Sequence, residues 1–185
     1  MLTVAYYYDL VKTRFGVAAI VWFDDKHGPR ITRILLPAPK EEILRMIRMN
    51  FPAAARKHCD LIAIFASDVR AFTEGRAPSF NTSLLDLSHV PPFHRKVLRA
   101  LAGISKGAVS TYGEIAAKAG SPGGARAAGQ GCANNPFPIV FPCHRVIRSD
   151  GALGGFGGGH KLKRALLDVE GVRFDSAGKV KRDRR

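Results

Sequence analysis

A short breaker at residues 89–92, His-Val-Pro-Pro, divides the chain into two halves with different patterns. Before it, β-branched and aromatic runs are typical of strands; after it, apolar residues recur at helical spacing. A chain of 185 residues can bury a core and is short enough for one domain or two small ones. We therefore expect an α+β protein with an N-terminal scaffold at residues 1–88, a mainly helical domain at 89–175, and a basic disordered tail at 176–185.

The first half predicts a small α/β lobe. Two strand-like runs, residues 15–23 and 31–36, flank a turn-forming segment and are expected to pair as a hairpin. One helix is expected around residues 41–47 and another from about Asp60 to Glu74, ending at Gly75. Residues 80–87 are predicted to form one more strand. The second helix is predicted to bury five apolar residues: Leu61, Ile64, Phe65, Val69 and Phe72.

The second half predicts three helices before residue 135. The first covers residues 93–101. Thr111 and Glu114 have capping-box spacing and open a short helix that stops at Gly120. Ser121 and Pro122 are expected to be the N-cap and first position of the next helix. Two short helices joined by a tight turn predict a helix-turn-helix, a motif that does not by itself show nucleic-acid binding.

The charge balance favours a polyanionic partner. Twenty-nine Lys and Arg against fifteen Asp and Glu give a net charge of +14, and nucleic acid is the leading candidate. The helix after residue 122 consists almost entirely of small residues, which indicates that something approaches its backbone closely; tight helix packing is the alternative. Arg126 is the long cation among them and suits insertion into a DNA groove, although a solvated surface charge has the same sequence signature.

The spacing of the cysteines and the hydropathy of the chain exclude several classes of protein. The three cysteines, Cys59, Cys132 and Cys143, form no Cys-x-x-Cys pair, so neither a disulfide framework nor a structural zinc is supported. The N-terminus lacks a secretory signal, and no apolar run is long enough to cross a bilayer. We expect a protein with no membrane partner in a reducing, cytoplasmic compartment.

The segment Pro142-Cys143-His144-Arg145 places a thiol beside an imidazole. A thiol reacts as its thiolate, which a neighbouring base or positive charge makes available. A lone cysteine is more often a small buried hydrophobe. Here it lies between a strand-like run at residues 139–141 and a glycine-rich loop, so we expect an exposed, reactive residue.

From about Pro92 to Phe174 the chain closely resembles the O6-alkylguanine-DNA alkyltransferases, which repair DNA at the cost of their own activity. The resemblance rests on five segments in order: Val-Ser-Thr-Tyr-Gly-Glu at 109–114, Ala-Arg-Ala-Ala-Gly at 125–129, Asn-Asn-Pro at 134–136, Pro-Cys-His-Arg-Val-Ile at 142–147, and Glu-Gly at 170–171. It implies that the first half is the family's ribonuclease H-like lobe.

The resemblance also implies a reaction. Cys143 matches the acceptor that irreversibly takes an alkyl group from O6 of guanine, or from O4 of thymine, once per molecule. His144 and Glu170 match the groups that activate this thiol through a bridging water. Asn135 matches the residue that ties the active-site turn together, and Tyr112 the phenol that protonates the departing guanine. The implied partner is double-stranded DNA carrying O6-alkylguanine, with no cofactor or metal, and the implied protein is a monomer, nucleoid-associated in a prokaryote.

The same family extrudes the damaged nucleotide from the duplex. Arg126 matches the residue that fills the vacated stack from the minor groove, while four small residues of its helix lie against the DNA: Ala125, Ala127, Gly129 and Gly131. The glycine-rich loop matches a wall for the flipped base, through Leu153, Phe156, Gly157 and Gly158. Some relatives have tyrosine in place of Phe156 and serine in place of Gly157. The loop lacks the register of a nucleotide-binding motif.

Three other functions remain open at this point. Alkyltransferase-like proteins bind damaged guanine without repairing it, but they lack the acceptor cysteine that this chain has at position 143. A transcriptional helix-turn-helix protein would not need Tyr112, Asn135, His144 and Glu170 together. A Cys-His hydrolase would need an oxyanion hole and turnover.

Overall fold

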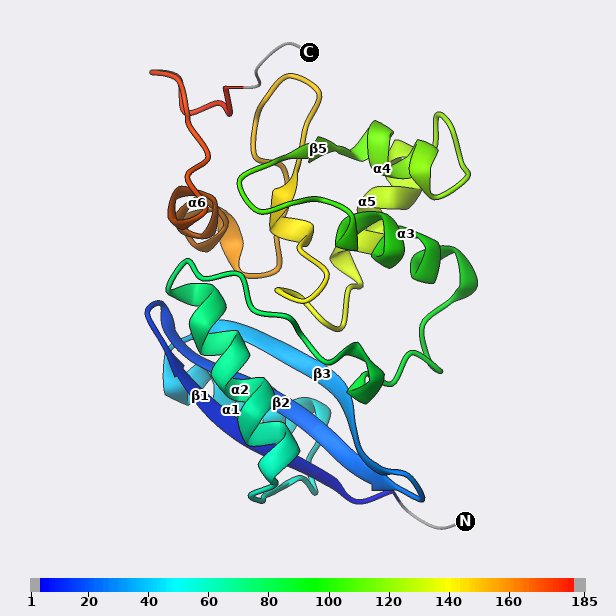
Figure 1. The fold of residues 1–185 in the computed structure, drawn as a ribbon, viewed down its shortest axis with the longest axis vertical. Helices are drawn as coiled ribbons and strands as arrows, with labels where there is room; N and C mark the ends of the chain where they lie inside the picture. The colour runs from blue at the N-terminus through cyan, green and yellow to red at the C-terminus, as the bar shows by residue number, and fades with distance from the viewer. Residues whose placement is uncertain (1–3, 182–185) are drawn as a thin grey trace. The chain divides into compact units, whose positions relative to one another are not determined.

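The computed structural model describes residues 4–181, and contacts along the chain separate it into two compact units between Ser88 and His89 (Figure 1). Each unit has its own set of buried apolar side chains. Within the described residues, no helix combines the length and the hydrophobicity that crossing a bilayer requires.

A four-stranded sheet in the order β3-β2-β1-β4 forms the centre of the first unit. Strands β1 and β3 each pair antiparallel with β2, and β4 pairs parallel with β1. Gly16 closes the first turn at φ +114°, where a Cβ atom would lie 2.7 Å from the carbonyl oxygen of Ala38. The predicted hairpin is confirmed as β2 and β3, whereas β1 was not predicted. The strands are β1 (Tyr6–Thr13), β2 (Gly16–Asp25), β3 (Gly28–Ala38) and β4 (Ala55–Arg56).

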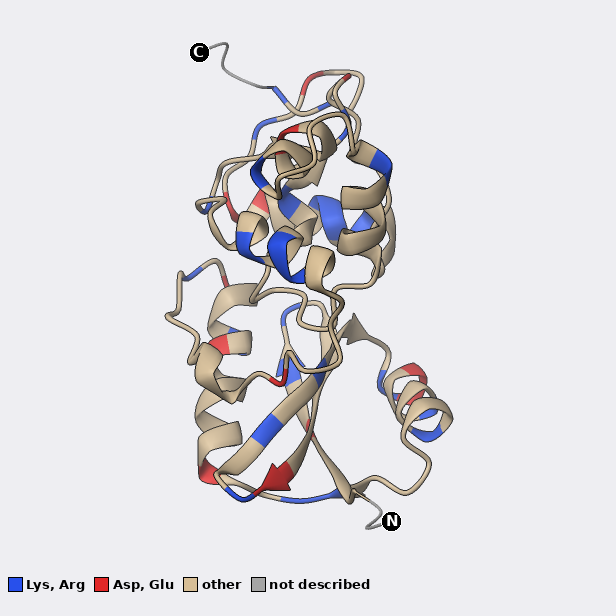
Figure 2. Ribbon diagram, turned by 90° about the vertical axis from the view of Figure 1, so that its right-hand side faces the viewer, with Lys and Arg blue, Asp and Glu red and all other residues tan. Residues whose placement is uncertain are grey.

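Helices cover both faces of this sheet (Figure 2). Helix α1 (Lys40–Asn50) buries Ile43 and Ile47 against Ala19, and helix α2 (Asp60–Thr73) packs along β1 on the other side. Because successive side chains of a strand point to opposite faces, a strand covered on both sides needs a continuous apolar run. The uninterrupted apolar stretch of β2 meets that need.

The predicted buried stripe of α2 is partly wrong. Leu61 and Ile64 are 46% and 64% exposed, while Ile62 and Ala66 are buried beside the correctly predicted Phe65, Val69 and Phe72. The helix contains apolar residues on more than one face, so spacing alone left its orientation ambiguous. Its end was predicted correctly: Gly75 lies at φ +84° directly after the C-cap, as in a Schellman motif.

The strand predicted at residues 80–87 is also wrong. The segment contains a short 3-10 helix, η1 (Thr82–Leu84), and an isolated bridge between Leu85 and Ile31. The Asn81 side chain accepts a hydrogen bond from the Ser83 amide, and this local turn competes with strand pairing.

In its described residues, the second unit contains four α-helices, one 3-10 turn and one pair of parallel strands. The capping box that opens α4 is confirmed, since Thr111 and Glu114 exchange both of its hydrogen bonds. The next helix begins later than predicted, because Ser121 and Pro122 lie in a turn and Gly124 is its N-cap. The elements are α3 (Pro92–Ala102), β5 (Ser110–Thr111), α4 (Tyr112–Lys118), α5 (Ala125–Ala133), the 3-10 turn η2 (Cys143–Arg145), β6 (Val146–Ile147) and α6 (Gly159–Val169).

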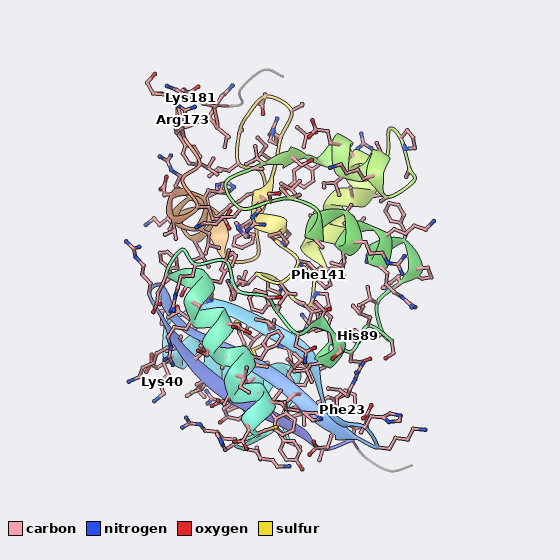
Figure 3. All side chains as sticks on the ribbon, viewed as in Figure 1. Phe23, Lys40, His89, Phe141, Arg173 and Lys181 are labelled. Carbon is pink, nitrogen blue, oxygen red and sulfur yellow. The ribbon has the colours of Figure 1, made fainter. Side chains whose placement is uncertain are left out.

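The segment predicted as a disordered tail is ordered through residue 181. Val180 is buried and bridges Phe174, and the Lys181 amide donates to the carbonyl of Arg173 at 2.9 Å (Figure 3). The prediction of a solvated tail rested on its many charges. Val180, however, anchors the segment through apolar contacts, and Gly178, at φ +74°, allows a turn before it. Residues 182–185 of the predicted tail lie outside the described residues.

Candidate active site

Cys143 lies at the start of η2, directly before β6, and a clasp of hydrogen bonds from Asn135 holds the turn that leads to it. The Asn135 Nδ2 donates to the carbonyl oxygen of Phe141 at 2.8 Å and to Cys143 Sγ at 3.4 Å. The Asn135 Oδ1 accepts from the amide of Phe137 at 2.9 Å. One side chain therefore fixes both ends of the turn and contacts the sulfur.

This turn replaces the strand predicted at residues 139–141, which is wrong. Ile139 has φ +79°, a left-handed conformation that is strained for a β-branched residue. The amide of Phe141, labelled in Figure 3, donates to the carbonyl of Phe137 and closes a helical turn instead of pairing with a strand. Apolar composition alone predicted a strand, but the side-chain bonds of Asn135 stabilise a tighter backbone.

Cys143 is buried, with 7% of its surface exposed, and the prediction of an exposed residue is wrong. Burial raises the pKa of its thiol, and the hydrogen bond from Asn135, the charge of Lys163 and nearby backbone amides offset that increase only in part. The resting residue is therefore a thiol at neutral pH. A reaction at this sulfur needs a group that accepts its proton.

His144 and Glu170 lie in direct contact, and Arg145 joins them. The His144 Nε2 is 3.1 Å from Glu170 Oε1, and the Arg145 guanidinium donates to both carboxylate oxygens, at 2.7 and 2.9 Å. Arg145 also donates to the carbonyl of Ile104. The sequence prediction named Arg145 only as part of a motif; its role as the counter-ion of Glu170 depends on a contact between residues 25 positions apart.

The end of α6 determines where Glu170 lies. Glu170 is the C-cap, Gly171 follows at φ +82°, and the amide of Val172 donates back to the carbonyl of Leu167. These bonds form a Schellman motif, and Leu167 and Val172 share one apolar cluster beneath it. A buried carboxylate at a helix C-terminus is unfavourable for the helix dipole, so the charge of Arg145 is needed to stabilise it.

The protonation states follow from these contacts. Burial alone would raise the pKa of Glu170, but hydrogen bonds from His144 and Arg145 outweigh it and hold that pKa at about 2. Burial lowers the pKa of His144, more than its contact with Glu170 raises it. His144 is thus neutral beside an ionised carboxylate. Because a carboxylate only accepts, the proton of the imidazole lies on Nε2, and Nδ1 carries the basic lone pair.

Tyr112 begins α4, and its hydroxyl donates to the carbonyl oxygen of Gly155 at 3.3 Å. Burial raises its pKa, and the negative charge that Cys132 and Cys143 carry when ionised adds to that effect. The phenol therefore keeps its proton at neutral pH. Gly154 approaches this ring so closely that a Cβ atom would lie 2.9 Å from the hydroxyl oxygen, which explains a glycine at this position of the loop.

The other predicted loop residues line the same region to different degrees. The Phe156 ring lies edge-on to the His144 imidazole, with centroids 6.3 Å apart. Leu153 packs against the apolar cluster of Ile147, and Gly157 is exposed. Gly158 is half-buried, and a Cβ atom there would meet Leu162 at 2.5 Å.

Lys163 is a buried cation that the sequence prediction missed. Its Nζ donates to the carbonyl oxygen of Val146 at 2.6 Å, and also to those of Leu153 and Gly155. Burial lowers its pKa to about 8, against the opposing effect of the nearby Cys143 and Cys132 thiols. The sequence could have indicated its burial, because Lys163 directly follows Leu162 among the buried apolar residues of α6, where a lysine is unusual.

The predicted DNA-binding residues of α5 do not form one exposed surface. Arg126 and Ala127 are exposed, and Ala125 and Gly129 are half-buried. Gly131 is buried, and a Cβ atom there would lie 3.0 Å from two methyl carbons of Val97 in α3. Close helix packing explains Gly131, so its predicted contact with DNA is not retained.

Comparison with known proteins gives these features a context. Residues 92–172 match the family described as 6-O-methylguanine DNA methyltransferase, DNA binding domain. The methylated-DNA–protein-cysteine methyltransferase of Methanothermobacter thermautotrophicus is 38% identical over 156 residues, which cover 84% of this chain and 80% of the relative. That of Mycobacterium tuberculosis strain H37Rv is 44% identical over 102 residues, 55% of this chain and 61% of the relative.

Solved structures agree in fold. The O6-methylguanine methyltransferase of M. tuberculosis superposes with a TM-score of 0.68 and 32% identity, covering 91% of this chain and 93% of that one. The M. tuberculosis OGT in complex with DNA gives a TM-score of 0.69 and 31% identity over 89% and 93% of the two chains. The second unit thus contains a domain of the class described as 6-O-methylguanine DNA methyltransferase, DNA binding domain. The chain as a whole belongs to the methylated-DNA–protein-cysteine methyltransferase family.

Proposed function

We propose that this protein repairs DNA by transferring an alkyl group from O6 of guanine to its own Cys143. The observation that carries the proposal is a buried thiol hydrogen-bonded by Asn135 and followed directly in the chain by a neutral imidazole whose Nε2–H donates to an ionised carboxylate. The curated relatives are named for methyl transfer to a protein cysteine, and one solved relative is bound to DNA.

The chemistry follows from the protonation states. His144 Nδ1 accepts the thiol proton through a bridging water, and Glu170 and Arg145 hold the imidazole in the tautomer that can do so. The sulfur attacks the carbon bonded to O6, a carbon–sulfur bond forms, and the carbon–oxygen bond breaks. Tyr112 gives its proton to the guanine ring, which leaves as a neutral base. A thioether is a poor leaving group, so each molecule reacts once.

Access to the base requires that it leave the duplex, because its O6 is stacked and paired inside. We assign α4 and α5 to a helix-turn-helix, with Arg126 filling the vacated position. Arg126 is exposed on α5, whose other exposed residues are Ala127, Gln130 and Ala133. It is the cation among them, so its side chain can extend toward DNA. The protein acts as a monomer in this scheme, in the cytoplasm or on the nucleoid.

Mass spectrometry of the intact protein tests the reaction directly. After incubation with a duplex that contains O6-methylguanine, we expect one added methyl group, on the peptide that contains Cys143. Cys143→Ala should show no gain in mass while still binding DNA. Cys132→Ala is the matched control, because burial raises the pKa of Cys132 to about 12 and the thiol has no clasp of its own; it should still accept one methyl. Methylation at another residue would overturn the assignment.

A further inference from the structure

A basic cleft lies between α3 and the end of α4, separate from the residues assigned to the reaction. The hollow has a volume of about 450 Å³ and is lined by Lys96, Arg99, Ala100, Lys118, Ala119 and Gly120. Three of these six residues are cations and none is acidic. The three cationic side chains are exposed, and Figure 2 shows basic segments gathered on the helices of this unit.

The cations of this cleft have no counter-ion in the part of the chain that the structure describes. Among residues 4–181, the side chains of Lys96, Arg99 and Lys118 form no ion pair or hydrogen bond. Helix α3 contains no Asp or Glu, so it offers no partner one turn away. Lys118 is one turn after Glu114, but that carboxylate is engaged by Ser110 and by the capping box.

Interaction with helix dipoles explains only part of the arrangement. Arg99 and Lys118 lie in the last turns of α3 and α4, where a cation stabilises the helix. Lys96 lies in the middle of α3, where that effect is small. A helix C-terminus carries about half a negative charge, so three cations around one hollow leave a clear excess of positive charge. The excess suits an anion.

The position of the cleft along the chain identifies which anion. Only residues 121–125 separate Gly120, in the cleft, from Arg126, the residue proposed to enter the duplex. A chain of that length spans at most roughly 20 Å, which is less than one turn of DNA, about 34 Å. A duplex seated on Arg126 therefore carries backbone phosphates within reach of the cleft.

We propose that this cleft binds backbone phosphate of the DNA duplex, within about six base pairs of the extruded nucleotide. The proposal rests on the proposed function, because it extends the contact with the same duplex. The lysines supply point charges and Arg99 a fork that matches two phosphate oxygens. Such contacts carry no sequence information; they fix the position of the protein on the duplex.

The test compares two triple variants with equal loss of charge. The cleft variant loses the three cations of the cleft through Lys96→Ala/Arg99→Ala/Lys118→Ala. The α1 variant loses three exposed cations of α1 through Lys40→Ala/Arg45→Ala/Arg48→Ala. Binding to a duplex is measured by fluorescence anisotropy across a range of salt concentrations. The salt slope is the change in the logarithm of the binding constant with the logarithm of the salt concentration, and each lost phosphate contact reduces it by about 0.9. The parent's advantage in affinity over the variant therefore falls roughly threefold when the salt concentration rises from about 50 to 200 mM.

A set of duplexes with single neutral methylphosphonates locates the contact. The parent protein should lose affinity at defined phosphates beside the lesion, and the cleft variant should be insensitive at those same positions. An unchanged salt slope in the cleft variant, or an equal change in the α1 variant, would refute the proposal that the cleft binds phosphate. Methyl transfer from the free base O6-methylguanine uses no phosphate; if the parent protein fails there as well as with duplex, the proposed function fails and not merely this contact.

Discussion

Replacing Glu170 with glutamine removes the charge on which the active-site network depends. The carboxylate side chain is 3% exposed and accepts from Arg145 and His144. A glutamine of the same shape leaves Arg145 charged and without its counter-ion in a buried site. We therefore expect Glu170→Gln to destabilise the second unit and to slow alkyl transfer.

The magnitude follows from the pKa of Glu170. A fall from 4.5 to about 2 corresponds to about 3 kcal/mol of stability. Removing one partner of a buried pair typically costs about 3–5 kcal/mol, which agrees. Because the pKa is depressed in the folded state, this stability is fully present above pH 4.5 and is lost as the pH falls toward 2. Roughly 2 kcal/mol of it is lost by about pH 3.

Urea unfolding followed by circular dichroism, at pH 7 and at pH 3, measures both effects. Asp168→Asn is the matched control, since Asp168 lies in the same helix but is 49% exposed and forms a surface ion pair with Arg164. That variant should lose less than about 1 kcal/mol. The reasoning fails if Glu170→Gln is no less stable than Asp168→Asn at pH 7, or if its deficit does not shrink at pH 3.

Three further changes test the site and its surroundings. Arg126→Ala should slow transfer from duplex DNA more than transfer from the free base, because only the duplex must be opened; equal slowing in single-turnover assays would remove Arg126 from that role. Tyr112→Phe should slow single-turnover transfer by roughly 10²- to 10⁴-fold, as expected for a lost general acid, with duplex affinity retained in anisotropy measurements. Gly131→Ala should lower the free energy of unfolding by about 1–3 kcal/mol through its contact with Val97, and an unchanged urea midpoint would contradict the packing explanation.

Local patterns predicted the helices well because their signals are short in range. The capping box at Thr111 and the C-terminal glycine at position 75 each depend on residues within one turn of the chain. The strand predictions were less successful. Apolar composition at residues 139–141 could not reveal the side-chain clasp of Asn135, which overrides the preference for a strand.

The candidate active site was likewise predicted only in part. Resemblance and chemistry directed attention to Cys143, His144 and Glu170, two of which are adjacent in sequence. The contribution of Arg145 could not be predicted, because it depends on a contact with a residue 25 positions away. The burial of Cys143 is likewise a property of the folded core and not of its neighbours in sequence.

The depth of Cys143 also affects which other molecules its sulfur can meet. Dissolved oxidants and electrophiles attack thiolates that water reaches. A protonated sulfur with 7% of its residue exposed presents neither the charge nor the access that those reagents need. A protein that can react only once thereby resists accidental inactivation, and its acceptor sulfur stays unmodified until a damaged base reaches it.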